Sequence, residues 1–283
     1  MIEFRKLKHE DYQDMLDISK DIWEGTDYLP HVFHNWVDDN GIFLGGVDSN
    51  KNKVIAVAKL SKLYDGSGWL EGLRVHKDYR GQRLGRRISE EMLQRAKMAL
   101  EQGEIDKIAF STHITNVESR TMMESLGFKV KQANTLAIKN ISSLKTEQTL
   151  ENFKVEPWNV SFEEFKYHPY FVRRKGFLPL AFVYEEVTRE LYEKLKESNC
   201  FIKINQHEGV FKYKGEPNFI VMDDTFEGIN TFMDYYLLSY KDKEFKELFT
   251  PFLSHDKELI EKFKNAGYTS WGDWKPDYFY YVY

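Results

Sequence analysis

The sequence contains little that would crosslink the chain or place it in a membrane. Its 283 residues include one cysteine, Cys200, so an internal disulfide is excluded, which favours a reducing compartment. No apolar run approaches the roughly 20 residues that a membrane-spanning helix needs. The first five residues also lack the apolar core of a signal peptide. We therefore expect a cytoplasmic protein that does not span a membrane.

An excess of positive charge is also missing. The 40 Lys and Arg residues are outnumbered by 45 Asp and Glu residues, which gives a net charge of −5 at pH 7. This balance argues against nucleic acid or an anionic membrane as a partner. No spacing of His, Cys, Asp and Glu is typical of a metal site, so we expect no metal. Aromatic residues are abundant, at 16% of the total, which favours aromatic-lined pockets or interfaces.

Hydrophobic periodicity predicts alternating strands and helices. The expected order over residues 2–137 is β-α-α-β-β-β-α-β-α-β, with antiparallel strands before the alternating part. This order predicts an α/β (α+β) fold with a mixed central sheet flanked by helices. A polar stretch then favours a boundary, so we expect one domain over 1–140 and a second α/β domain over 150–283. The second domain repeats the element order of 67–137, which indicates a degenerate internal duplication.

The most distinctive stretch is RVHKDYRGQRLGRR, which joins a predicted strand to the helix expected over 83–101. The first turn of a helix has unpaired N–H groups and a partial positive charge, so phosphates bind there readily. Gly81 and Gly85 let a ligand approach the backbone, and the arginines add charge. The alternative is a solvated basic helix start. We call residues 80–86 of this stretch the basic turn.

Two motifs resemble those of a known family. GWLEGLRVHKDYRGQRLGR resembles the acetyl-CoA signature of the GCN5-related N-acetyltransferases (GNAT), and NVESRTMMESLGF resembles the second signature of that family. The resemblance covers about residues 1–137 and implies the GNAT fold. Given the repeated element order, the C-terminal domain is expected to be a degenerate GNAT-like repeat. It implies acetyl-CoA as co-substrate. The resemblance implies that the backbone of Leu73, Arg74 and Val75 pairs with the pantetheine arm. It implies that the pyrophosphate is held by Arg80, Gly81, Gln82, Arg83, Leu84, Gly85 and Arg86. It also implies that Asn116 and Ser119 touch the thiol end.

The sequence departs from the family pattern at two positions. Arg83 stands where the family usually has a glycine, and its backbone can still donate if the side chain points outward. Met123 stands where the family often has a tyrosine as general acid, and methionine cannot donate a proton. We therefore assign no general acid, since solvent can protonate the leaving thiolate. For Asn116, a plain helix cap is the alternative to a ligand contact.

Glu71 is the candidate general base. It stands on the strand before the basic turn, where the family often carries a catalytic glutamate, and would take a proton from the attacking amine directly or through water. Strand alternation predicts that Glu71 shares a side with Leu73 and Val75. The alternative is a structural ion pair with a neighbouring Lys or Arg. His113 is a second candidate base with a structural role as its alternative, whereas His76 is expected on the surface.

The aromatic segment WEGTDYLPHVFHNW is the candidate acceptor loop. It is similar to a stretch of histidine N-acetyltransferase and related amino-acid acetyltransferases. The resemblance suggests that Tyr28, Phe33 and Trp36 cover a small substrate side chain, while Asp27 contacts its ammonium. A hydrophobic staple over the core is the alternative.

These features lead to one main functional hypothesis and two alternatives. The first is acetyl transfer from acetyl-CoA to a small amine, with a free amino acid as the leading class. The alternatives are a protein or peptide N-acetyltransferase, and a non-catalytic acyl-CoA-binding regulatory module. The acceptor, the acyl-chain selectivity, the role of the C-terminal domain and the oligomeric state are left open by the sequence.

Overall fold

The computed structural model describes residues 1–144, 149–180, 182–212, 218–241, 247–253 and 256–283. The chain forms two compact units. Unit 1 comprises residues 1–110, 121–129 and 282–283, and unit 2 comprises 111–120 and 130–281. The predicted division into domains 1–140 and 150–283 stays a prediction, and residues 145–148 between them lie outside the described ranges.

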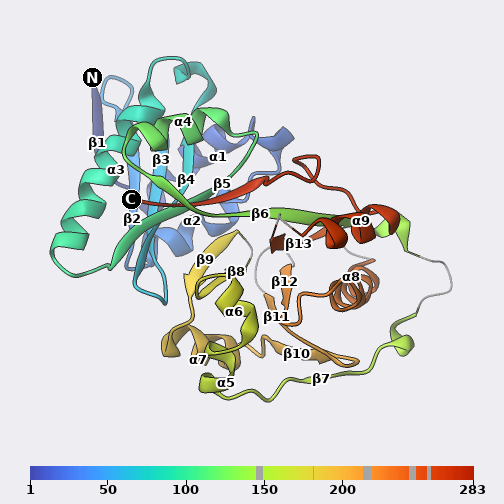
Figure 1. Cartoon of the computed structure of the whole chain (residues 1–283). Helices are drawn as coiled ribbons and strands as arrows, with labels where there is room; N and C mark the ends of the chain where they lie inside the picture. Colours follow the sequence, from blue (N-terminus) through green and yellow to red (C-terminus); the bar gives the residue numbers. More distant parts are fainter. Residues whose placement is uncertain (145–148, 181, 213–217, 242–246, 254–255) are drawn as a thin grey trace. The chain divides into compact units, whose positions relative to one another are not determined.

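The first half of the chain has the element order that the sequence predicts (Figure 1). The elements are β1 (Ile2–Lys6), α1 (Tyr12–Ser19), α2 (Leu29–Asp38), β2 (Ile42–Asp48), β3 (Lys53–Lys62), β4 (Ser67–Val75), α3 (Leu84–Glu101), β5 (Lys107–His113), α4 (Val117–Ser125) and β6 (Lys129–Asn140). Strands β1 to β4 pair in sequence order and antiparallel, whereas β4 and β5 pair parallel. The mixed α/β fold predicted from the sequence is thereby confirmed.

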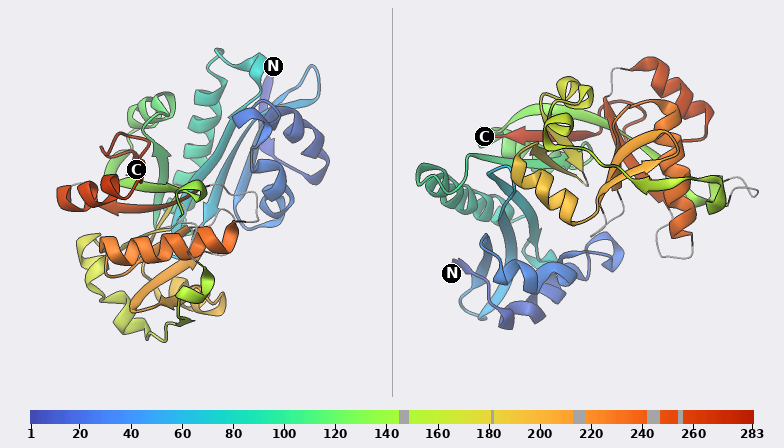
Figure 2. Two further views of the ribbon diagram at one scale, coloured as in Figure 1. Left: turned by 90° about the vertical axis from the view of Figure 1, so that its right-hand side faces the viewer. Right: turned by 90° about the horizontal axis from the view of Figure 1, so that it is seen from below.

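Helices cover both faces of the sheet of unit 1 because both faces of β3 are apolar. Val57 packs in one cluster with Leu29 and Phe33 of α2. On the other face, Ala56 and the Phe4 ring both lie next to Gly46. The guanidinium of Arg87 in α3 lies over the Phe4 ring. Figure 2 shows α3 in teal and α1 and α2 in blue on either side of these strands. Residues 76–83 connect the end of the central strand β4 to the start of α3.

The second half continues with shorter elements. They are β7 (Val155–Pro157), α5 (Phe162–Lys166), α6 (Pro169–Arg173), β8 (Phe177–Leu180), β9 (Val183–Glu186), α7 (Arg189–Glu197), β10 (Phe201–Ile204), β11 (His207–Lys212), β12 (Asn218–Val221), α8 (Phe226–Tyr240), β13 (Glu247–Leu253), α9 (Lys257–Asn265) and β14 (Tyr278–Val282). Both faces of β12 are buried: Phe219 belongs to the core cluster with α8 and α9, and Ile220 to the cluster with α5, α6 and α7.

The pairing in unit 2 repeats that of unit 1. Strands β10, β11 and β12 pair antiparallel and β12 pairs parallel with β13, as β2, β3 and β4 pair antiparallel and β4 pairs parallel with β5. Helix α8 connects β12 to β13 as α3 connects β4 to β5. This repeated topology supports the predicted internal duplication. In the part of the chain that the structure describes, no helix is long and apolar enough to cross a membrane.

Candidate active site

Strand β4 is paired with its parallel partner β5 only over its first three residues. Its ladder with β5 covers Ser67–Trp69 paired with Lys107–Ala109, whereas its ladder with β3 continues to Val75. Among the described residues, no ladder pairs the second half of β4 on the β5 side. Such an edge can accept an added strand through main-chain hydrogen bonds. Here the Leu73 carbonyl accepts from the Arg74 guanidinium at 3.0 Å and the Val75 carbonyl from Arg80 at 3.1 Å, so an added strand would share or displace these side-chain bonds. Leu73, Arg74 and Val75 lie on this stretch.

A bulge in β4 changes the side to which Glu71 points. Lys59 pairs with Glu71 and Val57 pairs with Arg74. A step of two residues along β3 therefore corresponds to a step of three residues along β4. Lys59 and Val57 face the same side because they are two apart, and their partners must face that side as well. Glu71 therefore shares a side with Arg74. The prediction that it shares a side with Leu73 and Val75 is wrong, because simple alternation fails across a bulge.

Gly72 lies inside this bulge and has to be glycine. Its φ of +65° is in the left-handed region, and a Cβ would lie 2.6 Å from Cζ3 of Trp36. The neighbouring carboxylate of Glu71 is half-buried and accepts a hydrogen bond from the Ser61 hydroxyl at 2.5 Å. The bulge thus turns a carboxylate toward the face that α2 covers and brings Trp36 close to the strand.

Buried Lys59 ties the same region together. Its ammonium is bound to the Asp39 carboxylate and donates to the Trp36 carbonyl at 2.9 Å, at the end of α2. Its side chain is fully buried, and burial lowers the pKa of Lys59 despite the neighbouring carboxylate of Asp39. Lys59 pairs in register with Glu71, so the candidate base lies opposite a cation held in place by a helix end.

The basic turn has an open helix start. Arg83 is the N-cap of α3, with φ 58° and ψ 16°, and its side chain makes no capping hydrogen bond. Gly81 also has a positive φ, of 74°. This left-handed conformation explains why the family usually has glycine at the position of Arg83: glycine adopts it without steric cost. The first N–H groups of α3 are thus left for an anion.

The arginines of the turn differ in how far they are engaged. Arg80 donates from Nε to the Val75 carbonyl at 3.1 Å, and Arg86 pairs with Glu90 at 2.7 Å. Arg83 is exposed, and none of the described residues is a hydrogen-bond or ion-pair partner of its guanidinium. Exposed charge at an uncapped helix start is the arrangement that a pyrophosphate would complete.

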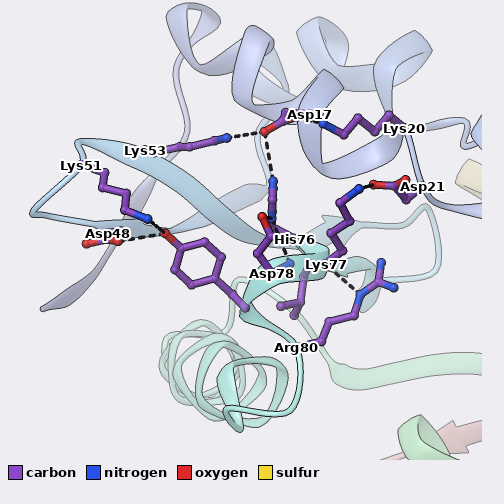
Figure 3. A network of polar contacts seen from close by, with 12 residues as sticks. Asp17, Lys20, Asp21, Asp48, Lys51, Lys53, His76, Lys77, Asp78 and Arg80 are labelled. Carbon is purple, nitrogen blue, oxygen red and sulfur yellow. Dashed lines mark hydrogen bonds and ion pairs between the residues drawn. The ribbon is translucent and has the colours of Figure 1, made fainter.

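The residues between β4 and the basic turn are anchored on two sides. His76 bonds through Nε2 to Asp17 of α1 at 3.0 Å, and its Nδ1 accepts from the Asp78 N–H at 3.2 Å (Figure 3). The Tyr79 hydroxyl donates to Asp48 at 3.0 Å, at the end of β2. His76 is only 4% exposed, so the expectation of a surface residue is wrong. Sequence reasoning missed it because its partner is 59 residues away.

The acceptor loop is clamped to β4 by an ion pair. Arg74 donates from Nε and Nη2 to the two carboxylate oxygens of Asp27, both at 3.0 Å, and Asp27 is 3% exposed. The guanidinium lies 4.7 Å from the ring centroid of Trp23 and 5.5 Å from that of Tyr28. Asp27 is thus engaged by a protein cation, which leaves no free carboxylate for the ammonium that the sequence assigned to it.

The three predicted aromatics of this loop differ in exposure. Phe33 is fully buried and packs edge-on against Phe43, so it belongs to the core, as the staple alternative proposed. Trp36 is half-buried and stands edge-on to Tyr28 with ring centroids 6.1 Å apart. Tyr28 is 39% exposed, and desolvation around its hydroxyl raises the pKa to about 12. Tyr28 and Trp36 keep surface for a ligand, and Phe33 does not.

The remaining candidates are distributed between the units. Asn116 and Ser119 belong to unit 2, where the Asn116 side chain accepts from the Ser119 N–H at 3.4 Å, which makes it a cap of α4. His113 is also in unit 2; burial lowers its pKa, and its Nδ1 contacts the Thr115 hydroxyl at 2.7 Å. Met123 is in unit 1 and is 6% exposed.

The helix start of unit 2 that corresponds to the basic turn is closed. The Thr225 hydroxyl caps α8 by accepting from the Gly228 N–H at 3.1 Å, and Asp223 accepts from the Thr225 N–H at 3.0 Å. Two acidic residues, Asp223 and Asp224, stand where the basic turn has arginines. The Asp224 carboxylate is paired with the buried guanidinium of Arg174 at 2.9 Å. The start of α8 is capped by its own side chains, and the cap takes up an N–H group that a phosphate would need. No group of three or more metal-ligating side chains occurs within the described ranges.

Comparisons with known proteins agree with this geometry. The sequence profile of the acetyltransferase (GNAT) family matches residues 4–128. Histidine N-acetyltransferase of Oreochromis niloticus is 34% identical over 83 residues, which are 28% of this chain. The match covers 24% of that protein, so the chain is similar to about a quarter of its length.

Two solved structures show the same fold over the whole chain. A GCN5-related N-acetyltransferase from Sphaerobacter thermophilus has a TM-score of 0.60 at 10% identity, over 100% of this chain and 95% of its own. One from Kribbella flavida has a TM-score of 0.51 at 12% identity, over 100% of this chain and 71% of its own. The fold, the profile match and the open helix start after β4 together confirm the family predicted from the two motifs: residues 4–128 belong to the acetyltransferase (GNAT) family of enzymes.

Proposed function

We propose that the protein transfers the acetyl group of acetyl-CoA to the amine of a small molecule, with a free amino acid as the leading class. The observation that carries the proposal is the bulge in β4. It lies next to the strand edge proposed for the pantetheine, and it turns Glu71 to the side on which Arg74 holds the acceptor loop. Donor and acceptor sites are thereby proposed to meet at one strand.

The residues that would hold acetyl-CoA are those of the strand edge and the basic turn. The pantetheine would pair with the backbone of Leu73 to Val75, and the pyrophosphate would lie on the N–H groups at the start of α3. The left-handed turn at Gly81 and Arg83 aims these groups outward and leaves the helix uncapped. Asn116 and Ser119 remain proposed contacts for the thiol end.

Glu71 is proposed to take the proton of the attacking amine, directly or through water. The neutral amine then attacks the thioester carbonyl, the C–N bond forms, and the C–S bond breaks. The α-amine of a peptide, with a pKa of about 7.7–8.0, loses its proton more easily than a lysine side chain near 10.4, which favours an α-amine over a lysine side chain as the acceptor. Met123 cannot protonate the thiolate, so water is the proposed proton source. His113, kept neutral by burial, is the second candidate base.

The acceptor would contact the exposed aromatic surface of Tyr28 and Trp36. Because the Asp27 carboxylate is paired with Arg74, its proposed role is to hold Arg74 and the acceptor loop together, without direct contact to the ammonium. The match to a histidine N-acetyltransferase supports an amino-acid acceptor. Cys200 is buried and is the single cysteine of the sequence, which agrees with the proposed reducing, cytoplasmic location.

The test is acetyl-CoA turnover against a panel of free amino acids, with products identified by mass spectrometry. We expect one amino acid to be preferred and acetylated on its α-amine. Glu71→Gln should lower kcat on the order of 100-fold, the usual contribution of a general base, with CoA affinity unchanged. Turnover only with peptide N-termini would replace the small-amine proposal by a peptide acceptor. CoA binding without turnover on either would leave a regulatory module.

A further inference from the structure

The segment between β4 and the basic turn contains a buried histidine whose two ring nitrogens are both engaged. We propose that His76 is a positioning residue for the pyrophosphate site, because it fixes the backbone from which the basic turn starts. This proposal rests on the proposed acetyl-CoA site. It adds a residue that touches neither the reacting atoms nor the phosphates and that acts through Asp78 and Asp17.

The hydrogen bonds of His76 define which tautomer is present. A backbone N–H can only donate, so the bond from the Asp78 N–H at 3.2 Å requires Nδ1 to be the acceptor. The ring hydrogen of the neutral imidazole is then on Nε2, from which it donates to Asp17 at 3.0 Å. The ring therefore connects a helix of the core to one particular peptide of the segment before the turn.

Asp17 is a firm anchor for this bond. Its carboxylate also binds the ammonium groups of Lys20 and Lys53, which hold the pKa of Asp17 well below its ordinary value (Figure 3). It therefore stays ionised and keeps accepting from His76 over the working pH range. Met15 and Ile18, on the same helix, are 1% exposed, so packing fixes the position of α1. The Asp17 carboxylate is therefore an acceptor in a fixed position, and its bond holds His76 in place.

The held segment lies directly between the two halves of the proposed acetyl-CoA site. Val75 ends the strand edge proposed for the pantetheine, and Gly81 begins the left-handed path into α3. His76 and Asp78 set the direction of the chain between them, and Arg80 then donates back to the Val75 carbonyl at 3.1 Å. Without the histidine, the strand edge and the open helix start lose their fixed spacing. Acetyl-CoA would then have to order the segment on binding.

Three variants test the role of His76. His76→Ala removes both bonds, whereas His76→Asn keeps an acceptor for the Asp78 N–H, because asparagine Oδ1 takes the place of Nδ1. His9→Ala is the matched control: His9 also pairs with an aspartate, Asp38 at 2.7 Å, but both side chains are more than half exposed. The readouts are the Kd of CoA from calorimetry, and kcat and KM for both substrates.

We expect His76→Ala to weaken CoA binding on the order of tenfold, the cost of losing one or two hydrogen bonds that preorganise a site. The KM for acetyl-CoA should rise equally, while kcat and the KM for the amine stay within twofold of wild type. His76→Asn should recover most of the affinity, and His9→Ala should bind CoA like wild type.

Equal CoA affinity in wild type and folded His76→Ala would overturn the proposal. A fall in kcat and a rise in the amine KM matching the loss of affinity would do so as well, since a general structural defect affects every parameter. If His76→Ala does not fold, the CoA affinities of His76→Asn and Asp17→Asn test the proposal instead. Asp17→Asn weakens the bond to His76 and should raise the Kd of CoA. If the wild-type protein itself does not bind CoA, the proposed function has failed, and this result is distinct from those above.

Discussion

The left-handed conformation of Arg83 offers a direct test of the basic turn. An L-residue in this region costs about 1–2 kcal/mol relative to right-handed conformations, and glycine avoids that cost. Glycine loses about 0.5–1 kcal/mol more backbone entropy on folding, so the two effects partly offset. Arg83, with φ 58° and no capping bond, should therefore be less favourable at its position than glycine by up to about 1 kcal/mol.

The matched comparison is Arg83→Gly against Arg83→Ala. Both variants remove the same exposed charge, and only alanine keeps a Cβ in the left-handed conformation. We expect the glycine variant to be more stable by about 0.5–1 kcal/mol, which is opposite to the helix interior, where alanine exceeds glycine by about 1 kcal/mol. Urea unfolding measures the difference as a change in midpoint at constant slope.

The same pair of variants reports on acetyl-CoA binding. Both lose one positive charge near the proposed pyrophosphate, so both should bind CoA more weakly than wild type in low salt, and the gap should shrink as salt screens the charge. The glycine variant should bind at least as tightly as the alanine variant, because it reaches the left-handed turn without strain. An alanine variant that is the more stable of the two would refute a left-handed residue 83.

Two further predictions concern side chains outside the turn. Asp27→Ala should destabilise the protein by about 3 kcal/mol in urea unfolding, because it leaves the guanidinium of Arg74 buried without its partner; a cost below about 1 kcal/mol would show that the ion pair does not hold the acceptor loop. Thr225→Ala should cost about 1 kcal/mol through loss of the α8 cap, with no change in the KM for acetyl-CoA, and a raised KM would contradict the assignment of phosphate binding to unit 1.

Local signals in the sequence predicted the order of elements and the basic turn. Hydrophobic period distinguishes strands from helices within a few residues, and Gly81 with its flanking arginines marks a turn before an amphipathic helix. The open start of α3 follows from the same stretch, because Arg83 cannot accept a hydrogen bond from the helix N–H groups. These features depend on neighbours in sequence, so the local stretch contains all the information that they require.

The errors arose where the outcome depends on distant residues. The side to which Glu71 points is set by register with Lys59 and Val57 across a bulge, which alternation along one strand does not reveal. Asp27 looked available because its partner Arg74 is 47 residues away. Phe33 shows the limit of composition: an aromatic residue in a loop-rich stretch suits a pocket or a core equally well, and only packing decides.

Val282 and Tyr283 belong to unit 1, although most of the residues that precede them belong to unit 2. The Tyr283 N–H donates to the Ile108 carbonyl at 2.9 Å, and the Tyr283 ring packs against Phe128 with centroids 5.4 Å apart. During synthesis from the N-terminus, unit 1 is therefore incomplete until residues 282 and 283 have been added. A ribosome releasing a chain cut short near residue 140 would deliver every strand and helix of the proposed acetyl-CoA site, yet leave Ile108 and Phe128 without the contacts that close this unit.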